Sequence, residues 1–291
     1  MTRKIRKQWI GIGVATLAGA VAATTAISPV SAQHGGHGGA PPKDTAAPDK
    51  ATPTTIPAKG QLAAPQGGEA YLTDGGPKDT RIRIYRDIAL MRGHLLVGAE
   101  LIELGLWEEA LPHFLHPAEE LYGAMERYIK LHKIPPFDRQ LKALAQAVKA
   151  KNKPAYVQAA KVTEERIAAA LAGFKRFMTV QPFSSYTAQA LAEIAKVALA
   201  EYAASIENGR FTKPVEYQDS RGFIWHAEQV IARHAAEFEK VDAAAFTILK
   251  SALAELKPAW PTAVPPEKPV IDVATLAARI DAFTKATERF R

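Results

Sequence analysis

From Thr80 onward, apolar residues recur every three or four positions, as they do along one face of an α-helix. The clearest stripe joins Ile84, Ile88, Met91 and Leu95 in a helix predicted over 80–104, which Gly105 ends. The same spacing predicts helices over 117–132, 138–151, 154–178, 185–208, 214–238, 242–256 and 272–290. No segment alternates convincingly between apolar and polar residues, so the sequence predicts an all-α fold.

Two prolines interrupt this pattern after the first helix. Pro112 and Pro117 each lack a backbone N–H and clash with the preceding turn, which argues against one uninterrupted helix. Pro117 suits the first turn of a new helix. Residues 112–116 are therefore predicted to form a kink or an irregular turn.

The helical part also contains a weak internal repeat. Residues 102–107 (Ile-Glu-Leu-Gly-Leu-Trp) parallel residues 206–211 (Ile-Glu-Asn-Gly-Arg-Phe), and later apolar positions repeat at a similar offset. Helices rich in alanine and leucine can match by chance, but the common order of the matches favours duplication. The prediction is a duplicated helical bundle with two four-helix halves, 79–180 and 181–291.

The residues before the helices have a different character. Residues 1–32 have the layout of a secretory signal peptide: a basic start, an apolar run over 10–27 and small residues before Gln33. An uncleaved membrane anchor is the alternative, because the run is close to the ~20 residues that span a bilayer. Residues 33–78 are rich in Pro, Gly, Ala and Thr, which predicts a disordered linker. The mature protein is thus expected to begin at Gln33, in the periplasm.

The amino-acid composition excludes several kinds of site and partner. The chain has no cysteine, which excludes disulfides, a lipoprotein anchor and thiolate metal sites. The formal net charge of +7 falls when the four basic residues of the signal peptide leave, and the remainder does not indicate a nucleic-acid partner. No nucleophile elbow, phosphate loop or dinucleotide fingerprint is present, so no enzymatic activity is predicted.

The histidines carry the clearest chemical signal. His113, His116, Glu119 and Glu120 fall within eight residues, around the second of the two prolines. Imidazole and carboxylate ligands together suit iron, copper, zinc or manganese. The alternative is structural, because acidic residues stabilise a helix N-terminus and a nearby histidine can cap it. The pattern predicts a metal site in this segment.

Further candidate ligands lie outside that segment. Glu216, Asp219 and His226 share roughly one face of the helix predicted over 214–238. They form a second metal site or the other half of a shared one, or they are solvent-facing acids beside a core histidine. His94 lies on a mostly apolar face of the first helix. It is either a hydrogen-bonded core histidine or a buried ligand directed toward the segment around His113.

Two short motifs resemble known families. Glu201-Tyr202, residues 206–211, Glu216-Tyr217 and Gly222-Phe223 resemble the extracytoplasmic helical domain found before the membrane part of bacterial high-affinity iron permeases. The segment from His116 to Glu119 supplies the His-x-x-Glu of imelysin-like periplasmic iron-uptake proteins, although Phe114 stands where their motif has Gly. These resemblances imply periplasmic handling of a metal, with iron as that metal.

These observations favour an exported helical protein that binds or delivers a transition metal. Iron is the first choice, copper or another transition metal the alternative, and a membrane metal transporter the expected partner. His116 and Glu119 are the expected ligands, completed by His113, Glu120 or His94. Binding of haem b through histidine is a further hypothesis, and the oligomeric state is left open.

The rival hypothesis is a helical adapter that has no metal role. Gly98, Leu101, Gly105 and Trp107 have the spacing of one tetratricopeptide hairpin. Stable arrays of such hairpins need about three units. One unit supports a helical hairpin more than a peptide-binding groove.

Overall fold

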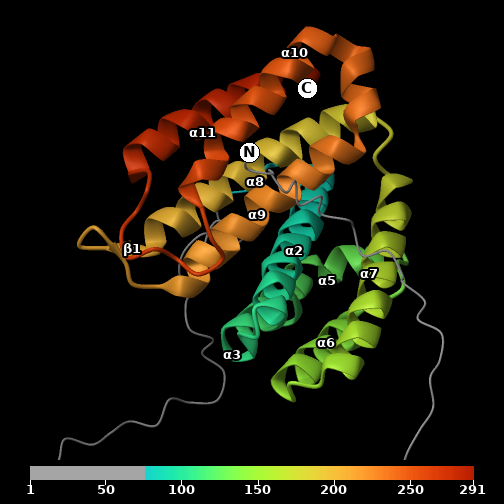
Figure 1. Cartoon of the computed structure of the whole chain (residues 1–291). Coiled ribbons are helices and arrows are strands. Elements are labelled where there is room, and N and C mark those ends of the chain that lie inside the picture. Colours follow the sequence, from blue (N-terminus) through green and yellow to red (C-terminus); the bar gives the residue numbers. More distant parts are fainter. Residues whose placement is uncertain (1–75) are drawn as a thin grey trace, which may run out of the picture. The chain divides into compact units, whose positions relative to one another are not determined.

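The computed structural model describes residues 76–291, which are almost entirely helical (Figure 1). The first set of helices is α2 (Thr80–Glu103), α3 (Trp107–Ala110), α4 (Pro112–His116), α5 (Tyr122–Leu131), α6 (Asp138–Lys149) and α7 (Lys153–Lys175). The second set is α8 (Phe183–Ala204), α9 (Pro214–Arg233), α10 (Ala235–Leu256) and α11 (Val273–Thr287). The all-α prediction is confirmed. The predicted signal peptide and nearly all of the predicted linker lie outside the described residues.

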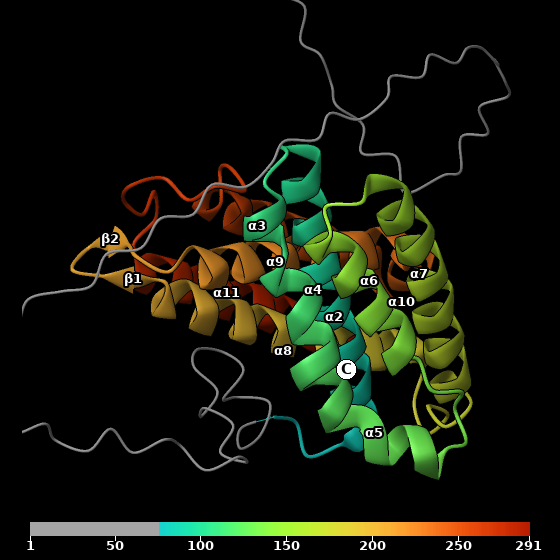
Figure 2. The ribbon, with the colours of Figure 1, turned by 90° about the horizontal axis from the view of Figure 1, so that it is seen from below.

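The helices α8 to α11 form a four-helix bundle. α8 packs against α9 and α11, and α10 packs against the same two helices. α2 lies against α8 and α9 and also contacts α3, α4 and α7. It therefore joins the bundle to the helices between α2 and α8. In Figure 1 the bundle is yellow to red, α3 to α7 are green, and α2 lies between the two groups; Figure 2 shows α2, α4 and α6 from below. The origin of the two groups by duplication stays a prediction.

The main hydrophobic core lies between α2 and the bundle and extends to α5, α6 and α7. Met91, Leu191, Ile224 and Phe283 are completely or almost completely buried in it. A smaller cluster fills the space between the end of α2, α4, α6 and α7, and includes Leu101, Phe114, Val148 and Tyr156. α2 therefore contributes side chains to both clusters. None of the helices in the described part of the chain has an apolar stretch that could cross a membrane.

Two glycines let α2 and α9 approach closely. A Cβ atom added to Gly222 would collide with the backbone carbonyl oxygen of Gly93, and one added to Gly93 would lie 2.6 Å from the ring of Phe223. The backbones thus touch where the helices cross. This crossing lies one residue before His94 and three residues after Asp219, so it sets the separation of those two side chains.

A Gly222→Ala variant should lose about 1–3 kcal/mol of unfolding free energy, because the added methyl group must push α9 away from α2. Urea unfolding would measure the loss. Gly123, on α5, offers a matched control, since a Cβ atom there meets nothing within 4 Å. Gly123→Ala should be neutral or stabilising. Equal stability of the two variants would contradict the backbone contact.

A partly buried ion pair also joins α9 to α2. Arg221 donates to both carboxylate oxygens of Glu100, at 3.0 and 2.8 Å. It also donates to the backbone carbonyl of Trp260, at 2.6 Å. The guanidinium thus joins α2, α9 and the segment that follows α10.

Three predicted helix boundaries were wrong. The helix predicted over 185–208 ends at Ala204, and β1 (Ile206–Glu207) and β2 (Arg210–Phe211) form a short antiparallel hairpin. Asn208 and Gly209 adopt positive φ angles of 51° and 73° in its turn, where Asn-Gly is the favoured pair. The helix predicted over 214–238 ends at Arg233, and α10 starts early with a kink at Asp242.

The first part of the proline-containing segment was also predicted incorrectly, whereas a helical segment does begin at Pro117 as predicted. Instead of an irregular turn, α4 is a short helix, followed by a π-helical turn over Pro117–Leu121 that leads into α5. Each proline lies in the first turn of its helical segment, where its missing N–H is tolerated. The π-helical turn connects α4 to α5 and accommodates the second proline within the helical path.

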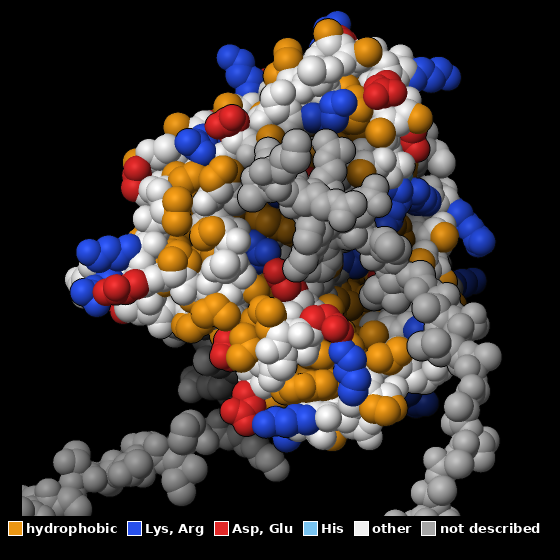
Figure 3. All heavy atoms as spheres, viewed as in Figure 1, with side chains coloured by type: hydrophobic (Ala, Val, Ile, Leu, Met, Phe, Trp, Pro, Cys, Tyr) orange, Lys and Arg blue, Asp and Glu red, His pale blue; other side chains and the backbone are white. Residues whose placement is uncertain are grey.

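Charged side chains of both signs are mixed on the face shown in Figure 3. Lys and Arg lie between Asp and Glu over the part of this face that the grey atoms leave visible. This face therefore shows no extended area of one sign.

Candidate metal centre

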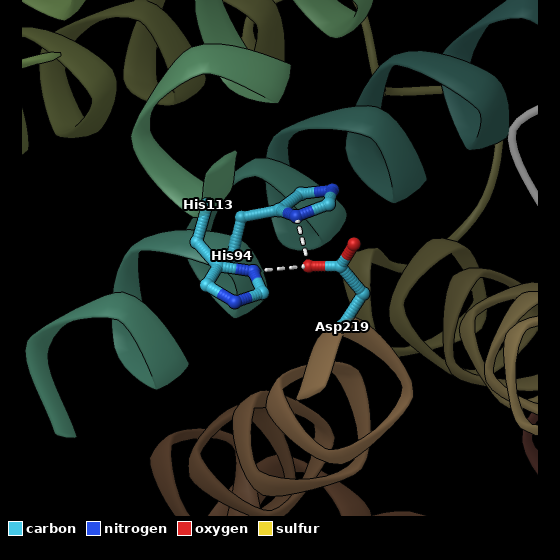
Figure 4. Close-up of side chains that lie close together, drawn as sticks. All are labelled: His94, His113 and Asp219. Atoms are coloured by element: carbon cyan, nitrogen blue, oxygen red, sulfur yellow. Dashed lines mark hydrogen bonds and ion pairs between the residues drawn. The ribbon is translucent and has the colours of Figure 1, made fainter. Parts of the chain in front are cut away.

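Asp219 is the centre of a buried polar cluster formed by three helices. Its Oδ1 atom lies 2.6 Å from Nδ1 of His94 on α2 and 2.7 Å from Nδ1 of His113 on α4. All three side chains are at most 2 % exposed. Figure 4 shows both imidazole rings directed toward the same carboxylate oxygen. The two histidines are far apart in the sequence but converge on one carboxylate.

Small residues on α2 make this convergence possible. A Cβ atom on Gly98 would lie 2.6 Å from the ring of Phe114 and 3.2 Å from Cβ of His113. Gly98 therefore lets α4 lie directly on α2. Together with the crossing at Gly93, this brings His94 and His113 to the same place.

His116 extends the cluster toward solvent. Its Nδ1 atom lies 3.4 Å from Oδ2 of Asp219, and its side chain is 22 % exposed. Its ring is nearly perpendicular to that of His94, with the ring centres 5.3 Å apart. The carboxylate thus faces three imidazoles, of which His116 is the one that reaches the surface.

Gln218 contacts His113 of this cluster, and the sequence analysis did not predict it as a site residue. Its Oε1 atom lies 2.9 Å from Nε2 of His113, and the side chain is completely buried. An amide is not a preferred ligand of these metals, so ligand chemistry gave no signal for it. Its position next to Asp219 on a helix that carries candidate ligands was the available hint.

The charges of the cluster suit a cation. Burial alone would raise the pKa of Asp219, but His94 and His113 together hold the pKa of this carboxyl well below its usual value. Burial lowers the pKa of His94, and the nearby carboxylate opposes that effect only in part. At neutral pH, Asp219 is therefore an anion and His94 a neutral imidazole, the forms that coordinate metals.

The geometry also fits a first-row metal ion. One ligand atom from each of His94, His113 and Asp219 can be chosen so that all lie within 4.8 Å of one another. Bonds of about 2.0–2.2 Å to one ion place ligand atoms about 3–4.4 Å apart. The hydrogen-bonded pairs would open by about 0.5 Å or more to admit an ion. His116 adds a further imidazole.

The other predicted ligands lie outside this cluster. Glu119 and Glu120 are exposed on the π-helical turn that follows His116. Glu216 is half-buried, one turn before Asp219. His226 is buried two turns after Asp219, or about 10 Å along the helix axis. The structure thus joins candidates from both sequence patterns in one cluster and leaves these four out of it.

Residues 184–290 match the family model of the iron permease-associated 4-helix bundle domain. This segment contains α8 to α11, and the match confirms the resemblance noted in the sequence. Asp219 lies inside the matched segment, whereas His94, His113 and His116 precede it. The match relates the chain to iron uptake. No curated protein and no solved structure matches it.

Proposed function

We propose that this protein binds a transition metal ion, iron in the first place, and passes it to a membrane transporter. The convergence of three imidazoles on the buried Asp219 carboxylate carries this proposal. A purely structural network would also satisfy these hydrogen bonds. However, a carboxylate among imidazoles is the donor set that iron, copper, zinc and manganese share. The role is binding rather than catalysis.

The choice of iron comes from the domain and not from the ligands. Histidine and carboxylate ligands alone do not distinguish iron from copper or zinc, because geometry and metal supply decide between them. The iron permease-associated domain contributes Asp219 and favours iron.

The exposed acidic residues have a place in this proposal. His94, His113 and Asp219 are closed off from solvent, whereas His116 is partly exposed. Glu119 and Glu120 follow it by three and four residues on the surface. They would attract a cation to His116, which is the point of entry.

We place the protein outside the cytoplasm. The secretory pattern of residues 1–32 and the iron permease-associated domain both support export. The partner would then be the extracytoplasmic side of a membrane iron transporter. N-terminal sequencing of the protein from its own cells should find Gln33 as the first residue, and a full-length product in the membrane would contradict export.

Titration of the mature protein with Fe²⁺ under anaerobic conditions tests the function. We expect one ion per chain and a rise in the unfolding free energy of about 2.7 kcal/mol when free metal is a hundred times the dissociation constant. Isothermal calorimetry with Fe²⁺, Cu²⁺ and Zn²⁺ would give the preference. If none of these ions binds at micromolar concentration, the cluster is a structural network and the adapter hypothesis is favoured. A Soret band would show haem instead.

A further inference from the structure

Gln218 makes an unusual contact for a core residue. Its side chain is completely buried, its Oε1 atom lies 2.9 Å from Nε2 of His113, and its Nε2 atom has no hydrogen-bond partner among the described residues. A buried amide group left unpaired costs about 1–3 kcal/mol. An apolar side chain of similar size would therefore make a more stable core. The amide calls for another explanation.

The contact made by the second ring nitrogen of His113 supplies that explanation. The Nδ1 atom of this ring lies 2.7 Å from the Asp219 carboxylate, so each ring nitrogen faces an oxygen acceptor. A neutral imidazole carries one proton, on one of its two nitrogens. Only the nitrogen without the proton can bind a metal ion. The two oxygens thus compete for the position of that proton.

We propose that Gln218 is a positioning residue that accepts the Nε2–H of His113 once a metal ion displaces the proton from Nδ1, and so stabilises the form of His113 in which Nδ1 is the metal ligand. This inference rests on the proposed metal function. The amide oxygen of Gln218 accepts the Nε2–H, while a cation beside Asp219 takes the place of hydrogen on Nδ1. Histidine ligands of metals nearly always donate their second N–H to such an acceptor.

The position of Gln218 supports this role. Gln218 and Asp219 are neighbours on α9, so a single helical turn carries both the carboxylate ligand and the acceptor that orients His113. Any movement of that turn shifts both together. The ring of His113 has no exposed surface and is held at both nitrogens. Its orientation is fixed before a metal arrives.

The test compares Gln218→Met, which removes the acceptor, with Gln218→Glu, which keeps one. Zn²⁺ serves as the probe because its complexes are diamagnetic. We expect Gln218→Met to weaken zinc binding about 10–100-fold while the metal-free protein unfolds at the same or a higher temperature. Gln218→Glu should retain zinc binding. Gln140 on α6 also has a buried Oε1 without a partner among the described residues, and Gln140→Met should change nothing in zinc binding.

Long-range ¹H–¹⁵N NMR of protein labelled at histidine reads the proton directly. In the zinc-loaded wild type, we expect the proton of His113 on Nε2. A proton on Nδ1 overturns the inference, even if Gln218→Met fails to fold. The inference is also overturned if Gln218→Met binds zinc as tightly as the wild type does. It is overturned as well if Gln218→Glu binds zinc as weakly as Gln218→Met does. A wild-type protein that binds no zinc, iron or copper overturns the metal function itself and this inference with it.

Discussion

An Asp219→Asn variant should lose metal binding while it keeps its fold. Asparagine has the shape of aspartate, and its Oδ1 atom can still accept the hydrogen bonds of His94 and His113. The variant lacks the negative charge that holds a cation among imidazoles. Loss of a residue that merely supports a ligand costs about 10–100-fold in affinity. We therefore expect the loss of Asp219 to weaken Fe²⁺ binding by more than about 100-fold, as measured by calorimetry.

Glu216 provides the matched control for Asp219. It is also a carboxylate on α9, lies one turn earlier, and is not part of the buried cluster. Glu216→Gln should bind Fe²⁺ as wild type does, and both variants should keep the helical content of the wild type. If Asp219→Asn binds normally, the cluster is not the metal site. If both variants bind weakly, the cause is the general charge of α9 and not the cluster.

The helices could be predicted because their apolar periodicity is strong and their ends carry local signals. Asp272 accepts a hydrogen bond from the N–H of Thr275, as expected of a residue that caps a helix. The hairpin after α8 was missed because Gly209 was interpreted as the end of a helix. In fact the chain ends the helix at Ala204 and uses Asn208 and Gly209 for a tight turn.

The buried cluster around Asp219 could be predicted only as separate residues of suitable type. Local spacing singled out His113 with His116 and, separately, Asp219, because ligand residue types are visible in a sequence. Their meeting depends on how closely α2 approaches α9 and α4. Gly93 and Gly98 set these distances through contacts with residues far away in the chain, and no local pattern encodes such contacts.

His226 was predicted as a ligand, and the structure gives it a different environment. It is completely buried on α9. Burial, reinforced by the positive charges of Arg92 and Arg233, lowers its pKa to about 3. An unfolded chain has the ordinary histidine pKa of about 6.5. His226 is thus neutral in the folded protein over a pH range in which the unfolded chain binds a proton.

Stability should therefore fall as the solution becomes more acidic than about pH 6.5. The contribution of His226 is complete above that pH and is lost progressively down to pH of about 3, because the unfolded state binds one more proton in this window. A shift of roughly 3.5 units corresponds to about 5 kcal/mol, at about 1.4 kcal/mol per pH unit. His94, whose pKa is also lowered, acts in the same direction, and Asp219 adds to the loss below about pH 3.8.

A His226→Gln variant isolates this effect, because glutamine keeps a polar side chain that cannot titrate. Urea unfolding at several pH values between 7.5 and 4 should show a smaller loss of unfolding free energy for the variant than for the wild type. The difference between the two proteins should grow as the pH falls, whatever their relative stability at pH 7.5. NMR titration of the folded wild type gives an independent check, since His226 should stay neutral at pH 5. A signal of His226 that titrates near pH 6.5, or parallel stability curves for the two proteins, would show that its buried neutral form does not control acid stability.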